Sequence, residues 1–371
     1  MTENTGNVAT YTYDNVYGLK SESYSVVGPT VNYTYDGVGN RLTEVRGGST
    51  TTYTYDADNR MTARGTTNYT YDANGNQATK VAGGVTTTYT WDHENRLTQV
   101  AVAGDPLTAY EYSTDGNRMS RWQGAKTFYL QDFRGTSGLD DVLAEYNATG
   151  VLIARYVHGP GIDEPLGMVR SGTFYFTFDA LGSATRLTTT AQGTNARYRY
   201  EAFGAARDTS EGTTNAYRFT ARELDPTASL HYYRARWYDP GAARFLSKDP
   251  VGIGDGPNLF GYVHNRGPNS VDPTGTTHFC RTGWDWFWCS LSGNLYWCWI
   301  YSAWGCNERS ANARQRTQTC FRDAVGYSIW WLAGCFGGPI TCVFAIIAFF
   351  GYYLYSLSRC LDQCCWGDFG P

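Results

Sequence analysis

The sequence predicts a mainly β protein, built from stacked β-hairpin repeats and followed by a small cysteine-rich tail that contains an α-helical hairpin. Three observations favour this fold class. A short motif, Tyr-x-Tyr-Asp, recurs through the first third of the chain. The composition suits strands and turns, with 30 tyrosines, 42 glycines and only 17% charged residues. Cysteine usage also changes abruptly, because every cysteine lies after Gly275.

The first segment, residues 1–122, consists of the repeats. From Tyr33 onward the motif starts lie 16 to 21 residues apart. This spacing leaves room for two strands of about 5–6 residues and two turns, but not for a strand and a full helix. Each unit is therefore predicted to be a β-hairpin. Because side chains alternate along a strand, both aromatic rings of a motif should lie on one face and the residue between them on the other. Copies begin at Tyr11, Tyr33, Tyr53, Tyr69, Tyr89 and Tyr110.

The second segment, residues 123–275, carries further aromatic and arginine-rich motifs. Together with the repeats, these motifs resemble the RHS or YD repeats and the RHS repeat-associated core of bacterial polymorphic toxins, Tc-toxin C subunits and teneurins. The resemblance implies a spiralling β-sheet shell, the YD-shell, which in full-length members encloses a C-terminal cargo. The stretches that carry it include Tyr175-Phe-Thr-Phe-Asp-Ala-Leu-Gly-Ser183, Arg199-Tyr-Glu-Ala-Phe-Gly204, Arg218-Phe-Thr-Ala-Arg-Glu-Leu-Asp225, His231-Tyr-Tyr-Arg-Ala-Arg-Trp-Tyr-Asp-Pro240 and Arg244-Phe-Leu-Ser-Lys-Asp-Pro250.

The candidate catalytic residues lie at the end of this core, in two Asp-Pro-x-Gly motifs that begin at Asp249 and Asp272. In processed members of the resembled family, the two aspartates form an intramolecular aspartyl protease that cuts just after the second motif. Carried over, the aspartates would share one proton and Lys248 would tune the pair. The cut would then fall at the Gly275–Thr276 or the Thr276–Thr277 peptide bond. The same motifs also make good turns, since proline fixes φ and glycine accepts a positive value, so a purely structural role is the alternative.

The tail, residues 276–371, is expected to follow its own folding rule. An even number of cysteines at irregular spacing indicates disulfides and an oxidising compartment, with metal binding or reduced thiols as the alternatives. No Cys-x-x-Cys knuckle is present, so no metal or other cofactor is predicted. Cys335 and Cys342 flank a Gly-Gly-Pro turn, and Cys320 and Cys360 lie at nearly equal distances beyond them, so these four are the disulfide candidates.

An uncharged run at residues 324–358 is the tail's most unusual feature. Gly337-Gly-Pro339 divides it into two apolar arms, which predicts an antiparallel helical hairpin. The second arm has nearly the length of a transmembrane helix. Three interpretations remain open: a membrane pore or anchor, the stapled core of a small secreted domain, and passive cargo inside the shell.

Function is predicted from these parts together. The chain would be the C-terminal part of an exported shell protein that presents, and by self-cleavage releases, a membrane-active effector. The alternative is a non-enzymatic cell-surface protein that binds glycans through its sheet and is tethered by its apolar tail. The expected partners are a membrane, of the target or of the producing cell, through 324–358, a carbohydrate and an immunity protein. A net charge of −4 without a basic stripe argues against nucleic acid. An extracellular or cell-surface location is expected, although no secretory signal is recognisable at the N-terminus.

Overall fold

The computed structural model describes residues 7–26, 28–132 and 139–280. All of them belong to one compact unit, residues 1–283. The predicted helical hairpin 324–358 and its four candidate cysteines lie outside the described residues. Within the described part of the chain, the structure is almost entirely β, with three short 3₁₀ helices and no α-helix. The predicted mainly β fold class is therefore confirmed for this part.

Twenty strands form one long antiparallel sheet, in which each strand pairs with the next along the chain. The sheet runs without a break through residue 122, where the repeat segment was predicted to end. The strands are β1 (Ala9–Tyr13), β2 (Leu19–Tyr24), β3 (Val31–Tyr35), β4 (Arg41–Arg46), β5 (Ser49–Tyr55), β6 (Met61–Arg64), β7 (Thr67–Tyr71), β8 (Gln77–Ala82), β9 (Val85–Trp91), β10 (Leu97–Val102), β11 (Thr108–Tyr112), β12 (Arg118–Gln123), β13 (Ala125–Asp132), β14 (Asp141–Asn147), β15 (Leu152–His158), β16 (Pro165–Val169), β17 (Thr173–Phe178), β18 (Ala184–Thr189), β19 (Thr194–Tyr200) and β20 (Ala206–Ser210).

Smaller elements follow the long sheet. A four-stranded sheet comes first, and a two-stranded sheet ends the described chain. These elements are η1 (Phe219–Ala221), β21 (Glu223–Asp225), β22 (Leu230–Tyr233), β23 (Arg236–Asp239), β24 (Arg244–Phe245), η2 (Gly252–Asp255), η3 (Val263–Asn265), β25 (Ser270–Val271) and β26 (Phe279–Cys280).

The aspartate of each repeat makes the turn of its hairpin. Oδ1 of Asp36 accepts hydrogen bonds from the backbone N–H groups of Val38 and Asn40, at 3.0 and 2.8 Å. Asp56, Asp72 and Asp92 make the same pair of bonds in their own turns. The carboxylate thus satisfies two turn amides that would otherwise lack partners.

The two faces of a repeat strand differ as predicted. In β3, Tyr33 is buried, Tyr35 is half-buried, and Thr34 between them is exposed. Thr34 shares a 2.7 Å hydrogen bond with Thr43 on the neighbouring strand, so the outer face carries threonine pairs. The prediction that both rings share the inner face is confirmed.

The second aromatic residue of each motif ties its hairpin to the preceding one. Its side chain donates a hydrogen bond to a backbone carbonyl oxygen at the start of a strand in the previous repeat. The pairs are Tyr35 to Leu19 at 2.9 Å, Tyr55 to Arg41 at 2.9 Å, Tyr71 to Met61 at 3.0 Å, Trp91 to Gln77 at 2.8 Å and Tyr112 to Leu97 at 2.7 Å.

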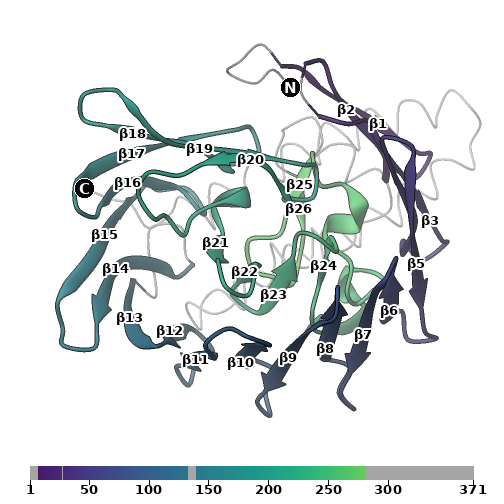
Figure 1. The fold of residues 1–371 in the computed structure, drawn as a ribbon, viewed down its shortest axis with the longest axis horizontal. Helices are drawn as coiled ribbons and strands as arrows, with labels where there is room; N and C mark the ends of the chain where they lie inside the picture. The colour runs from purple at the N-terminus through teal and green to yellow at the C-terminus, as the bar shows by residue number, and fades with distance from the viewer. Residues whose placement is uncertain (1–6, 27, 133–138, 281–371) are drawn as a thin grey trace, which may run out of the picture. The chain divides into compact units, whose positions relative to one another are not determined.

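The long sheet curves round the short one. In Figure 1, β1–β20 surround the strands β21–β24. Side chains of the inner strands bind the wall. Asp225 of β21 accepts a 2.7 Å hydrogen bond from Tyr110 of β11 and pairs with Arg121 of β12 at 2.6 Å. His231 of β22 is buried, and this burial lowers its pKa to about 3.

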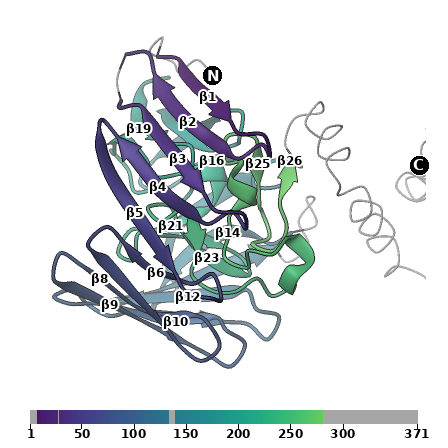
Figure 2. The same cartoon turned by 90° about the vertical axis from the view of Figure 1, so that its right-hand side faces the viewer.

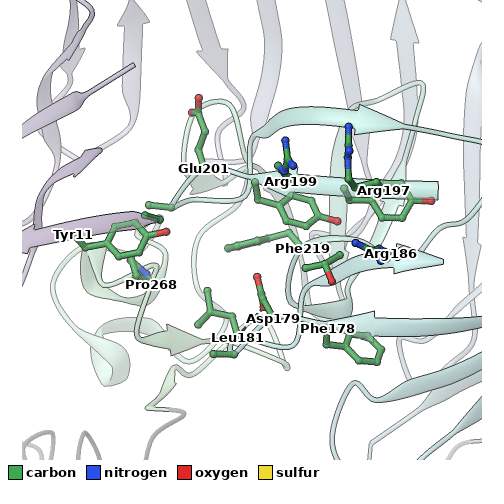
Figure 3. Close-up of a pocket in the computed structure, with 16 residues that line it drawn as sticks. Tyr11, Phe178, Asp179, Leu181, Arg186, Arg197, Arg199, Glu201, Phe219 and Pro268 are labelled. Atoms are coloured by element: carbon green, nitrogen blue, oxygen red, sulfur yellow. Dashed lines mark hydrogen bonds between the residues drawn. The ribbon is translucent and has the colours of Figure 1, made fainter. Parts of the chain in front are cut away.

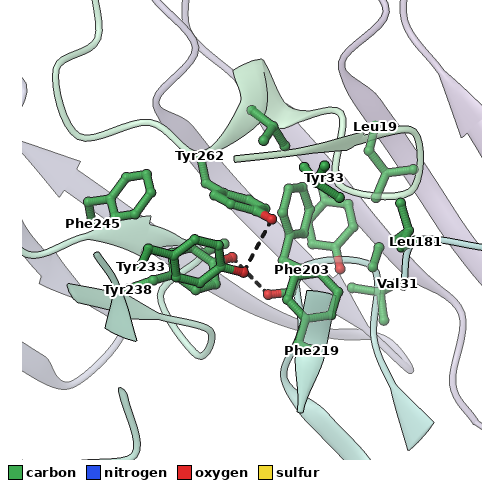
Figure 4. Packing of buried hydrophobic residues seen from close by; sticks show 14 residues of the cluster. Leu19, Val31, Tyr33, Leu181, Phe203, Phe219, Tyr233, Tyr238, Phe245 and Tyr262 are labelled. Atoms are coloured by element: carbon green, nitrogen blue, oxygen red, sulfur yellow. Dashed lines mark hydrogen bonds between the residues drawn. The ribbon is translucent and has the colours of Figure 1, made fainter. Parts of the chain in front are cut away.

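Aromatic rings fill much of the space between wall and inner sheet (Figure 4). Tyr233, Tyr238 and Tyr262 lie within 6 Å of one another between ring centroids. The buried hydroxyl groups have hydrogen-bond partners. Tyr238 donates to the carbonyl oxygen of Phe203 at 2.7 Å, and the Tyr233 hydroxyl contacts the Thr220 hydroxyl at 2.7 Å. Large aromatic side chains can therefore be buried here without losing hydrogen bonds.

The two ends of the long sheet meet through side chains. The backbone N–H of Ala202, after β19, donates to buried Glu22 of β2 at 2.9 Å. Glu201 pairs with Arg46 of β4, and Arg207 of β20 lies 3.8 Å from the ring centroid of Tyr24. No strand pairing joins β20 to β1 among the described residues. We call this set of contacts the seam. Figure 2 gives the side view of the first strands.

Among the described residues, no helix is long and apolar enough to cross a membrane. The run 324–358, for which a membrane role was predicted, lies outside the described residues.

Candidate functional site

The two Asp-Pro-x-Gly motifs both form turns. Oδ1 of Asp249 accepts the backbone N–H of Val251 at 2.9 Å, and Oδ1 of Asp272 accepts that of Gly275 at 2.9 Å. Gly252 and Gly275 end the turns with φ values of +66° and +72°, which glycine adopts without strain. Both motifs therefore have the backbone conformation of turns, as the structural alternative expected, and each aspartate also makes contacts outside its own turn.

Arg236 of β23 brings the two aspartates together. Its Nη2 atom lies 2.7 Å from Oδ2 of Asp249 and 3.4 Å from Oδ2 of Asp272. All three side chains are at most 5% exposed. The guanidinium is also stacked on the ring of Phe245, with Cζ 3.7 Å from the ring centroid. Two motifs separated by nineteen residues thus share one buried cation.

Two of these three side chains, Arg236 and Asp272, contact the predicted scissile bond. Nε of Arg236 donates to the carbonyl oxygen of Gly275. Oδ1 of Asp272 accepts the N–H groups of Thr276 and Thr277, both at 3.1 Å. The peptide between Gly275 and Thr276 is therefore held at both its carbonyl oxygen and its nitrogen.

Gly275 itself leaves no room for a side chain. A Cβ at this position would lie 2.1 Å from the carbonyl oxygen of Tyr233 and 3.1 Å from the backbone nitrogen of Arg236. The chain of the second motif thus passes directly against the turn that joins β22 and β23. This close approach places the Gly275 carbonyl within reach of Arg236.

Burial changes the acidity of the pair. It raises the pKa of the Asp249 carboxyl to about 6, and it raises the pKa of Asp272 as well. Arg236 acts in the opposite direction on both, because a nearby cation favours the ionised form. The site thus holds two carboxyl groups that are poor at ionising beside one guanidinium, the combination in which one carboxyl can keep its proton near neutral pH.

Lys248 lies elsewhere. A Cβ built on Gly75, in the turn between β7 and β8, would be 2.5 Å from Cε of Lys248. Its side chain therefore packs against the repeat wall, and the cation that contacts both aspartates is Arg236. Arg236 belongs to the core stretch His231–Pro240, for which the sequence predicted no catalytic role. The only hint in the sequence is that Arg236 and both Asp-Pro-x-Gly motifs belong to the same core segment.

A second group of polar side chains was not predicted. Asp255 ends η2, His264 lies within η3, and His278 precedes β26. One possible ligand atom from each lies within 4.8 Å of the others. These three residues come from separate segments of the chain, so no short spacing in the sequence marks them as a group.

A pocket of about 330 Å³ lies between the first strand and β17–β19 (Figure 3). It combines aromatic rings, such as Tyr11 and Phe178, with charged groups, such as Arg197 and Glu201. None of the predicted catalytic residues lines it. Carbohydrate binding stays a prediction.

The fold and the site together define a class, a β-sheet shell of YD repeats with a pair of aspartates at the end of its core. The teneurin YD-shell family model matches residues 1–253, so the chain belongs to this family. The prediction of an RHS/YD-repeat protein is confirmed.

Similar proteins include bacterial toxins. The tRNA3(Ser)-specific nuclease WapA of Bacillus spizizenii is 32% identical over 261 residues, which cover 67% of this chain and 11% of that protein. The toxin protein Tse5 of Pseudomonas aeruginosa is 43% identical over 58 residues, which cover 16% of this chain and 4% of that protein. The chain thus spans about a tenth or less of the length of these relatives.

Solved structures give a weaker likeness. A crystal structure of TcdB2-TccC3-Cdc42 aligns with 74% of this chain and 18% of that chain, with 18% identity and a TM-score of 0.39.

Proposed function

We propose that this chain is the C-terminal part of an exported shell protein that presents residues 276–371 as an effector and releases them by cutting itself after Gly275. The observation that carries the proposal is the position of Arg236, which contacts Asp249, Asp272 and the carbonyl oxygen of Gly275 at once. Membership of the YD-shell family and the toxin relatives support the presentation of an effector.

The proposed reaction is hydrolysis of the Gly275–Thr276 peptide. Ionised Asp249 removes a proton from water, whose oxygen forms a bond with the carbonyl carbon of Gly275. Arg236 stabilises the negative charge that develops on the carbonyl oxygen, which it already binds. Protonated Asp272 donates its proton to the nitrogen of Thr276, which becomes basic once the carbonyl carbon is tetrahedral, as the C–N bond breaks; before the reaction the two groups are already in contact, because Oδ1 of Asp272 accepts the N–H of Thr276 at 3.1 Å. The products are the carboxyl group of Gly275 and the amino group of Thr276.

The effector is proposed to act on membranes. Its uncharged run 324–358 is the supporting feature, and the tail after Gly275 has one histidine, one glutamate and no lysine, too few for the usual nuclease constellations. A membrane of the target cell and a protective immunity protein are the proposed partners. Depolarisation of lipid vesicles by the released tail supports this activity, whereas vesicles that keep their potential argue against it.

The experiment on release uses a chain tagged at both ends and run on a denaturing gel. Wild type is expected to give two fragments, and Asp249→Asn one intact band. Asp36→Asn is the matched control, because Asp36 binds its own turn amides as Asp249 does but belongs to a repeat turn. Fragments in all three chains, or an intact band in all three, would refute self-cleavage. An intact wild type would favour the alternative of a glycan-binding surface protein with a permanent tail.

A further inference from the structure

A cluster of metal-ligand side chains lies beside the aspartate pair but takes no part in the proposed cleavage. Nδ1 of His278 is 2.8 Å from Oδ1 of Asp255, and the rings of His264 and His278 have their centroids 4.3 Å apart. The side chains of Asp255 and His278 are 18% and 8% exposed, so the cluster is largely shielded from solvent.

The separation of the donor atoms suits a small transition-metal ion. Zinc binds histidine nitrogen and carboxylate oxygen at roughly 2.0–2.2 Å, so the ligand atoms around it lie about 3.3 Å apart. The three donors here lie within 4.8 Å of one another, and the closest two are already nearer than zinc requires. Small side-chain rotations would give three ligands of a tetrahedral site, and water would supply the fourth.

The chemistry of the donors is selective. Two imidazoles and one carboxylate suit zinc and its neighbours in the transition series better than calcium or magnesium, which prefer oxygen ligands alone.

We propose that Asp255, His264 and His278 together bind one divalent transition-metal ion, with Zn²⁺ as the best match. The site goes beyond the proposed function, since it needs no cleavage. It has one structural consequence that rests on that function: Asp255 and His264 precede the proposed cut, and His278 follows it. The ion would therefore connect the shell to the first residues of the released tail.

The test measures Zn²⁺ binding by the full-length chain in the Asp249→Asn background, which stays uncut under the proposed function. Zn²⁺ is titrated against a chelating dye. His264→Asn and His278→Asn should each bind one ion fewer than the parent chain, or bind it at least 10-fold more weakly. His93→Asn is the control, because His93 is exposed on a repeat turn and outside the cluster. All variants keep the ten cysteines, so any thiol-bound zinc is the same in each.

Asp255→Asn provides a second variant of nearly unchanged shape, in case a histidine variant fails to fold. It should also weaken Zn²⁺ binding at least 10-fold, since an amide is a much poorer ligand than a carboxylate. Equal numbers of ions with equal affinity in the parent chain, Asp255→Asn and the folded histidine variants would overturn the proposal. That result would leave the proposed self-cleavage untouched, and an uncut wild-type chain would likewise leave the metal site untouched.

Discussion

Close packing determines which groups Arg236 contacts, and burial determines the pKa values of the two aspartates. Arg236 can bridge two aspartates and a carbonyl oxygen only because the chain passes within contact distance at Gly275. The aspartates in turn owe their raised pKa values to the loss of water around them. Both effects depend on how the interior is packed, and two predictions at this scale follow from them.

The first concerns pH. If Asp249 is the general base, it must be ionised, and its pKa of about 6 means that it is protonated, and so inactive, at lower pH. The rate of self-cleavage should therefore rise about tenfold per pH unit up to about pH 6, rather than reaching a plateau near pH 4. The chain is diluted from denaturant into buffers of different pH, and the intact fraction is followed on gels, with tryptophan fluorescence as the control for refolding. A rate independent of pH between 4.5 and 6 would contradict the role of Asp249.

The second concerns two glycines at equivalent turn positions. Gly116 and Gly204 have φ values of +86° and +88°, and both donate to the carbonyl oxygen three residues earlier. A Cβ at Gly116 would meet nothing, whereas one at Gly204 would lie 2.4 Å from the ring of Phe219. Gly116→Ala should cost about 1 kcal/mol for the backbone alone, and Gly204→Ala roughly 1–3 kcal/mol more. Urea unfolding of both variants measures the difference. Equal losses would mean that the Phe219 contact is unimportant.

At the scale of elements, the repeat works because three side chains have separate tasks. The aspartate makes the turn, the first ring fills the interior, and the second ring ties the hairpin to its predecessor. A hairpin alone is marginally stable, so this tie is what makes a stack out of units that cannot fold by themselves.

Tyr71 and Tyr69 provide a matched test of that tie. The hydroxyl of Tyr71 donates to the carbonyl oxygen of Met61 at 3.0 Å, whereas the buried hydroxyl of Tyr69 has no partner among the described residues. Tyr71→Phe should lower the free energy of unfolding by roughly 1 kcal/mol, and Tyr69→Phe should be neutral or stabilising. The comparison uses chemical denaturation under identical conditions. A larger loss for Tyr69→Phe would show that the inner rings, and not the ties, connect the repeats.

How much could be predicted from the sequence also differs between elements. The Tyr-x-Tyr-Asp period predicted the hairpins and their buried face correctly, because turn chemistry and strand alternation act over a few residues. The hydrogen bonds between successive hairpins were not predicted, since Tyr71 and Met61 meet only when two hairpins are stacked. Arg236 and the cluster of Asp255, His264 and His278 were missed for the same reason. Contacts between residues that are far apart in the chain produce no regular spacing in the sequence from which they could be predicted.

At the scale of the whole described unit, the sheet holds its inner strands through buried ion pairs and closes through the seam. Arg222 and Arg234 of the core both contact Asp163 of the wall, at 2.6 and 3.0 Å. Such pairs add little net stability but fix which surfaces meet, since a charge left alone in the interior is costly. These ion pairs therefore fix the inner strands, and with them Arg236 of the aspartate site, against the wall.

The proposed self-cleavage after Gly275 can be tested by the intact mass of the full-length chain after expression, taken under denaturing conditions. We expect two species from the wild type, residues 1–275 and a fragment that begins at Thr276, and only the uncut chain from Asp249→Asn and Asp272→Asn. A single intact polypeptide from the wild type would contradict it, as would a cut at another peptide bond that persists in both variants.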